Sequence, residues 1–240
     1  MRAAKIIGTV SIALLVIHCG SANARTVRPK QAPQVPRELK DTAKADFASL
    51  SDYQILLLAS DCTGNDDGSK YAATYGEAAL PRILTILQRD DLSATQITSL
   101  AFWVGGYKST DAVSGIIKKF EALKLPAVLS NEERWVIDSL IVGLGTTAQP
   151  EGIKLLDKLV TREYWLKREP QHQVPSLELD SEKTIELWRH CVLAAYALSG
   201  TDEAFSRLTT GKDIPKDLSH ALPSYARMCS QVRGTIPNDL

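Results

Sequence analysis

The sequence predicts an all-α protein built from helical hairpins. Aromatic residues make up only 6% of the chain while alanine and leucine are plentiful, a composition that favours helices over a strand-rich sandwich. Between Ile97 and Val104 apolar residues recur at the i, i+3, i+4, i+7 spacing of a buried helix face. The same spacing returns 40 residues later, between Ile137 and Leu144. Composition, periodicity and internal repetition therefore agree.

The charge balance excludes two classes of function. The chain has 28 Lys+Arg and 28 Asp+Glu, a formal net charge of zero, which lacks the basic footprint of a nucleic-acid binder. Its apolar runs are shorter than the 18 to 20 residues that span a bilayer. We therefore expect neither nucleic-acid binding nor a polytopic membrane protein.

The N-terminus predicts export. Arg2 and Lys5 precede a short apolar stretch at 6–17, and Ala22-Asn23-Ala24 follows as an A-x-A cleavage site. Residues 1–24 are thus expected to be a signal peptide, and the mature protein to begin at Arg25 in a periplasm or outside the cell. A lipoprotein anchor at Cys19 is the disfavoured alternative, because histidine stands where a small residue is needed. The mature chain keeps 26 basic and 28 acidic residues.

Residues 25–40 are predicted to be a proline-rich linker, with Pro29, Pro33 and Pro36 among polar residues. From residue 41 to 210 we expect the repeated hairpins. Residues 211–240 are expected to form a C-terminal cap or tail.

Two central units are related by the offset of 40 without gaps. Matching positions include Gly105 with Gly145, Asp111 with Glu151, Val113 with Ile153, Ile116 with Leu156, and Phe120 with Val160. A glycine turn at 105–106 or 143–145 is expected to end the first helix of each unit. Each unit is therefore predicted to be a helix, a turn and a second helix.

Two further units flank these. Leu80–Leu87 has the pattern of a second helix, and Leu50, Tyr53 and Leu57 form a candidate first helix before it. Downstream, a first helix is predicted over 188–195, followed by a shorter partner over 201–208.

This organisation resembles the HEAT-like repeat family, in an exported bacterial-type form. The local similarity lies in Glu77–Leu87, where Pro81 enters the first helical turn, and in 150–156, where Pro150 does the same. The resemblance implies an α-solenoid of about four hairpins. It also implies that the chain binds another protein, since most members of the family do so.

Two long loops are predicted, at 61–76 within the first unit and at 163–181 between the third and fourth units. The first contains Asp61, Asn65, Asp66, Asp67 and Gly68, which suggest Ca²⁺ ligands. The register is poor, because threonine occupies the first and twelfth positions of the corresponding calcium loop. We therefore expect no metal there and no cofactor elsewhere.

Catalytic motifs are weak. His172, His190 and His220 fall in the insert, a helix and the tail, and no metalloprotease, nucleophile-elbow or phosphate-loop motif is present. Glu132-Glu133 is interpreted as part of a capping box that begins with Ser130. No catalytic residue is predicted.

The cysteines leave two interpretations open. After signal removal, Cys62, Cys191 and Cys229 remain. Cys191 lies on an apolar helix face, which predicts core packing. The alternative is a disulfide between Cys191 and Cys229 in the C-terminal cap.

The predicted partner-binding residues are Tyr164, Trp165, Lys167 and Arg168, with Lys118 and Lys158 as a rim. An aromatic pair beside two cations is typical of an interface anchor, whereas Trp103, Trp135 and Trp188 are predicted to be core. The alternative for the aromatic pair is that it covers the insert. Lysines 118, 119, 154 and 158 form a row on the second helices that is either a rim or a solvated face.

The sequence therefore predicts an exported protein-binding α-solenoid, either a scaffold or assembly factor or an immunity-type protein. The alternative function is an enzyme that acts on an envelope polymer through carboxylates on the concave face.

Overall fold

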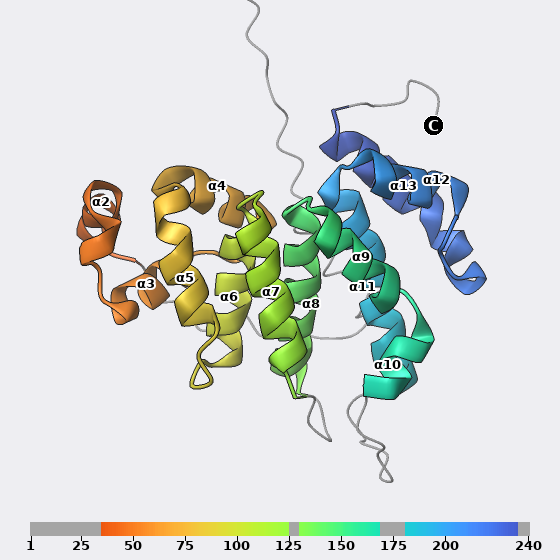
Figure 1. Cartoon of the computed structure of the whole chain (residues 1–240), viewed down its shortest axis with the longest axis horizontal. Helices are drawn as coiled ribbons and strands as arrows, with labels where there is room; N and C mark the ends of the chain where they lie inside the picture. The colour runs from red at the N-terminus through yellow and green to blue at the C-terminus, as the bar shows by residue number, and fades with distance from the viewer. Residues whose placement is uncertain (1–34, 125–129, 169–180, 235–240) are drawn as a thin grey trace, which may run out of the picture.

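The computed structural model describes residues 35–124, 130–168 and 181–234. Within these ranges the chain forms 12 α-helices and no β-strand, which confirms the all-α prediction (Figure 1). The predicted signal peptide and residues 25–34 of the linker lie outside the described residues. The linker was predicted to extend to residue 40, but helix α2 already begins at Arg37.

The described ranges contain the following helices. They are α2 (Arg37–Ala45), α3 (Asp52–Ala59), α4 (Asn65–Tyr75), α5 (Leu80–Leu87), α6 (Ala94–Gly105), α7 (Thr110–Ala122), α8 (Asn131–Thr146), α9 (Pro150–Leu159), α10 (Arg162–Arg168), α11 (Ser181–Ser199), α12 (Asp202–Thr210) and α13 (Leu222–Val232). Three short 3₁₀ helices are η1 (Phe47–Ser49), η2 (Glu77–Ala79) and η3 (Lys216–Ala221).

The helix starts obey the local rules that the sequence suggested. The side chain of Ser130 accepts a hydrogen bond from the Glu133 backbone N–H, and the Glu133 carboxylate accepts one from the Ser130 N–H, so the predicted capping box is confirmed. Ser93 begins α6 in the same way. Pro81 and Pro150 occupy the first turns of α5 and α9, where a missing N–H costs nothing.

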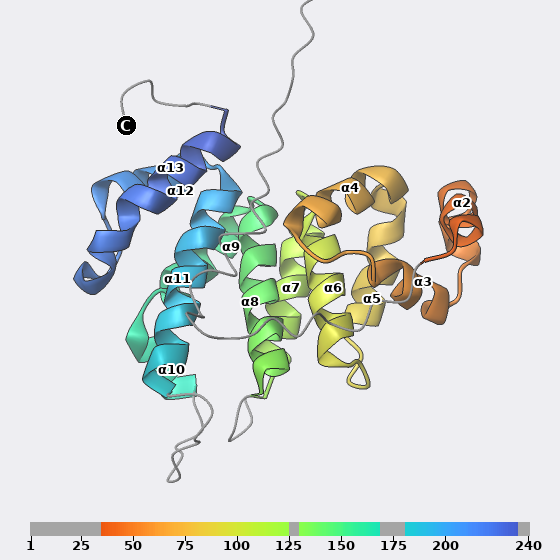
Figure 2. The ribbon, with the colours of Figure 1, turned by 180° about the vertical axis from the view of Figure 1, so that it is seen from behind.

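From α5 to α9, consecutive helices alternate between two rows that pack against each other. In one row α6, α8 and α11 lie side by side, and in the other α5, α7 and α9 do (Figures 1 and 2). At the ends of the first row, α4 packs on α6 and α13 packs on α11. The described part of the predicted C-terminal cap or tail therefore packs on α11 and α12 through α13.

The α6–α8–α11 row is held together by close backbone contact. A Cβ atom added to Gly145 in α8 would lie 2.2 Å from the Ala195 backbone oxygen in α11. One added to Gly105 in α6 would lie 2.8 Å from the Cα of Gly143 in α8. The prediction that residues 143–145 form a turn is wrong, because these glycines lie inside α8, where they let neighbouring helices touch.

The predicted loop at 61–76 is also wrong, because Asn65–Tyr75 is helix α4. Asp66 and Asp67 lie in its first turn, where the helix dipole favours negative charge. A Cβ on Gly68 would lie 1.9 Å from the Phe102 backbone oxygen, so this glycine allows α4 to pack closely on α6. The predicted buried face of the first unit fails at Tyr53, which is 74% exposed.

Candidate functional site

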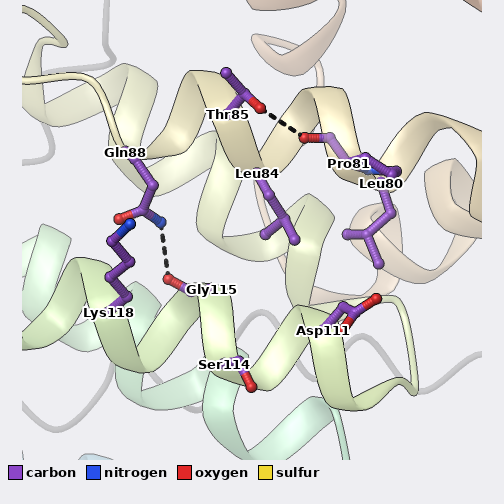
Figure 3. Close-up of a pocket in the computed structure, with 9 residues that line it drawn as sticks. All are labelled: Leu80, Pro81, Leu84, Thr85, Gln88, Asp111, Ser114, Gly115 and Lys118. Atoms are coloured by element: carbon purple, nitrogen blue, oxygen red, sulfur yellow. Dashed lines mark hydrogen bonds between the residues drawn. The ribbon is translucent and has the colours of Figure 1, made fainter.

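A groove lies on the α5–α7–α9 row, between α5 and α7 (Figure 3). Its volume is about 520 Å³. The residues that line it are Leu80, Pro81, Leu84, Thr85 and Gln88 on the α5 side and Asp111, Ser114, Gly115 and Lys118 on α7.

The floor of the groove is apolar because a glycine faces a leucine. A Cβ on Gly115 would lie 2.3 Å from Cδ2 of Leu84, so any larger residue in α7 would displace that side chain. Leu84 and Leu80 both point towards α7 in Figure 3. Nε2 of Gln88 donates a hydrogen bond to the Gly115 backbone oxygen at 3.0 Å, which ties the two helices together at one end of the groove. The floor therefore offers partly covered leucine surface.

The two ends of the groove carry opposite charges. Asp111 lies at the end near Leu80, and Lys118 at the end near Gln88 (Figure 3). Both side chains are exposed, and among the described residues no ion pair is formed by either. Seven residues of helix separate them by roughly 10 Å. The groove can therefore receive an apolar side chain that is flanked by a cation on one side and an anion on the other.

The predicted lysine row is only partly exposed. Lys118, Lys154 and Lys158 are exposed, as expected. Lys119 is buried: its Nζ donates a hydrogen bond to the Arg89 backbone oxygen at 2.7 Å, and burial lowers the pKa of its ammonium group. Lys119 therefore joins α7 to the end of α5 and does not belong to an exposed row.

The structure overturns the expectation that Trp165 is an exposed anchor. Its side chain is 1% exposed, and its Nε1 donates a hydrogen bond to the Leu159 backbone oxygen at 2.7 Å. Its ring contacts those of Phe120 and Trp188, with centroids 6.3 Å and 4.5 Å away. Trp165 thus packs α10 against α7 and α11.

Of the other residues in the predicted anchor, Tyr164 and Arg168 are partly buried and Lys167 is exposed. The guanidinium of Arg168 lies 4.3 Å from the centroid of the Phe120 ring and donates hydrogen bonds to the Tyr164 hydroxyl and the Phe120 backbone oxygen. Tyr164 is partly buried and packs edge-on against Trp165. Lys167 is exposed. The insert beyond Arg168, residues 169–180, lies outside the described residues.

The three cysteines that the structure describes are buried and are not joined to one another. Cys62, Cys191 and Cys229 are thiols in the structure, so the alternative of a Cys191–Cys229 disulfide is not realised. The Cys191 thiol donates to the Asp138 backbone oxygen at 3.6 Å. Burial raises the pKa of the Cys229 thiol above its usual range. These contacts place Cys191 in the core, which agrees with the packing interpretation.

Sequence reasoning missed the environment of Asp138 and the proximity of two histidines, and it predicted Trp135 wrongly. Burial raises the pKa of Asp138 in α8 to about 7, against the opposing effect of Arg134. Trp135, which was predicted to be core, is 56% exposed one turn before it. His190 and His220, far apart in sequence, have ring centroids 6.0 Å apart. The sequence offered a signal only for the pair of Glu186 and His190, which lie four residues apart on one helix face, and none for the approach of His220.

No helix in the described part of the chain is long and apolar enough to cross a membrane. No family model, curated protein or solved structure matches the sequence or the fold of this chain.

Proposed function

We propose that this chain is an exported, HEAT-like α-solenoid that binds a protein partner on its α5–α7–α9 row. The observation that carries the proposal is the α5–α7 groove, with its leucine floor and its oppositely charged ends. The groove takes the place of Trp165 as the proposed main contact with the partner, because Trp165 is buried. Lys154 and Lys158 on α9 remain exposed and extend the polar surface beside the groove.

The alternation of helices supports the repeat part of the proposal. Second helices α5, α7 and α9 lie side by side, and the 40-residue offset aligns Asp111 with Glu151 and Lys118 with Lys158. In α7 and α9 the first turn thus carries an acidic residue, Asp111 or Glu151, which the dipole of the helix favours. A partner that follows the row would meet the same alternation of charge from α7 to α9.

The shape and charges of the groove define the kind of partner segment that fits it. It presents a leucine-sized apolar side chain between a basic residue, which faces Asp111, and an acidic residue, which faces Lys118. Charges at the rim of an interface mainly guide association and select among partners, while the apolar contact supplies most of the affinity.

The test compares two charge reversals of the same kind. Lys118→Glu reverses the charge at the groove, and Lys212→Glu makes the same change at an exposed site after α12. Protein that co-purifies with the exported chain is identified by quantitative mass spectrometry, and its affinity for each variant is then measured by calorimetry. We expect one stoichiometric protein whose affinity falls about tenfold with Lys118→Glu and is unchanged with Lys212→Glu.

Equal binding by all three proteins would contradict the proposed groove. The alternative function is an enzyme that acts on an envelope polymer through carboxylates of the α5–α7–α9 row, where Asp111 and Glu151 are exposed. If the purified chain has no partner and clears a suspension of envelope polymer, with clearing lost in Asp111→Asn, the enzyme proposal replaces the binding proposal.

A further inference from the structure

The α5–α7 groove is walled by two helices that run in the same direction. Leu80 and Asp111 lie at one end of it, and Gln88 and Lys118 lie at the other (Figure 3). Because Lys118 follows Asp111 by seven residues of α7, the two charges are roughly 10 Å apart, or two helical turns. We infer that the partner segment in this groove is an amphipathic α-helix that runs antiparallel to α5 and α7. The inference rests on the proposed function and adds the conformation and the direction of the segment.

The floor of the groove offers no hydrogen bonds to the backbone of an extended segment. At its middle the backbone groups of Leu84 and Gly115 already bond within α5 and α7, and the Gly115 oxygen also accepts from Gln88. The nearby Thr85 hydroxyl donates to the Pro81 backbone oxygen at 2.9 Å. An extended segment laid over Leu84 would bury N–H and C=O groups without partners, which is costly. A helix bonds its own backbone and presents only side chains to the groove.

Gly115 makes room between α5 and α7 for the side chains of that helix. Under the offset of 40, the corresponding residue of α9 is Leu155, whose side chain is only 8% exposed. In α7 the same position has no side chain, and Leu84 of α5 lies beside it. The gap between α5 and α7 therefore admits apolar side chains of a third helix, whereas a leucine occupies the equivalent position in α9.

The charges at the ends of the groove define the spacing and the direction of the partner helix. Residues at positions i and i+7 of a helix lie on one face roughly 10 Å apart, which matches the separation of Asp111 and Lys118, and positions i+3 and i+4 lie between them. A helix is stabilised by an acidic residue in its first turn and a basic residue in its last turn. The acidic residue therefore comes first and faces Lys118, and the basic residue comes seven positions later and faces Asp111. This order sets the partner helix antiparallel to α7.

The test uses three synthetic peptides about 16 residues long, whose binding to the full chain is measured by fluorescence anisotropy. The forward peptide carries glutamate, two leucines and lysine at positions i, i+3, i+4 and i+7, and a covalent staple on its other face keeps it helical. The reversed peptide exchanges the glutamate and the lysine and keeps the staple. The extended peptide has the forward order, with two prolines in place of the staple. We expect the forward peptide to bind at least tenfold more tightly than either of the others.

A double charge exchange in the protein tests the direction of the helix. The variant that combines Asp111→Lys with Lys118→Glu should bind the reversed peptide at least tenfold more tightly than the forward peptide. Both residues are exposed, so this variant is expected to keep the native circular dichroism spectrum. The matched control combines Glu151→Lys with Lys158→Glu, the same exchange on α9, where Leu155 occupies the position of Gly115. It should keep the preference of the unaltered chain.

The inference is overturned if the unaltered chain binds the forward and reversed peptides equally, or if the extended peptide binds more tightly. It is also overturned if the double charge exchange leaves the preference unchanged, or if no peptide binds at about 1 mM. In those cases a co-purified protein whose affinity still depends on Lys118 would leave the proposed function in place and remove only the helical segment and its direction. A co-purified protein that is insensitive to Lys118→Glu would contradict the proposed function itself.

Discussion

The two helix rows use glycine for different purposes. In the α6–α8–α11 row, Gly145 lets the backbones of α8 and α11 touch, because even a Cβ would meet the Ala195 oxygen at 2.2 Å. In the α5–α7–α9 row, Gly115 faces a flexible leucine side chain across a groove. The first contact is backbone against backbone, whereas the second is backbone against the end of a flexible side chain.

The two rows differ in burial, which indicates that one row stabilises the fold while the other offers a surface for binding. From residue 139 to 145, α8 is buried on every side, and so is α11 from 191 to 199. In α7, by contrast, Asp111, Ser114 and Lys118 are exposed along the side that forms the groove. Substitutions of the apolar and glycine residues in these two buried segments should therefore reduce stability, while substitutions along the groove should change binding and leave stability nearly unaltered.

The largest expected effect is that of Trp165→Ala. The substitution removes a side chain that is 1% exposed and packs between Phe120 and Trp188, so the free energy of unfolding should fall by roughly 3–5 kcal/mol. Urea unfolding measures this loss. Lys167→Ala, two residues away and exposed, is the control and should change stability by less than about 0.5 kcal/mol. Unchanged stability in Trp165→Ala would restore the exposed-anchor interpretation.

A smaller, pH-dependent effect is expected in the first row. The pKa of Asp138 is about 7 in the folded chain, against an ordinary value of 3.8. Between these values the folded state binds more protons than the unfolded state, so the contribution of Asp138 to stability falls as the pH rises through that window. Asp138→Asn should therefore be more stable than the unaltered chain at pH 8, by roughly 1–3 kcal/mol, and show little difference at pH 4.

Urea unfolding of both proteins at the two pH values checks this dependence. A constant difference between them would mean that Asp138 titrates normally in the folded chain.

The hairpins of α6 to α9 could be predicted because apolar spacing, capping residues and proline positions all gave the same helices. Helix α4 was missed because Gly64, Asn65, Asp66 and Gly68 are typical of turns, and only packing on α6 explains a glycine inside that helix. The sequence analysis also assigned two tryptophans the wrong way round, because Trp135 was predicted to be core and is exposed, whereas Trp165 was predicted to be an exposed anchor and is buried.

The groove and the histidine pair depend on tertiary packing. Leu84 and Gly115 belong to different hairpins, and their contact follows from the way that α5 and α7 lie side by side. His190 and His220 are brought together by the return of η3 to the middle of α11, for which the apolar periodicity gave no signal. Predictions of such sites need the packing of helices, which local patterns do not contain.

The most direct test of the difference between the two rows is one pair of glycine substitutions measured by urea unfolding. Both Gly145→Ala and Gly115→Ala gain up to about 1 kcal/mol of helix propensity, so this effect cancels between them. Gly145→Ala should nevertheless lose about 2–3 kcal/mol, because two helix backbones must separate, while Gly115→Ala should be neutral or slightly stabilising, because Leu84 can turn aside. Equal losses, or a larger loss for Gly115→Ala, would contradict the distinction between a packing row and an available face.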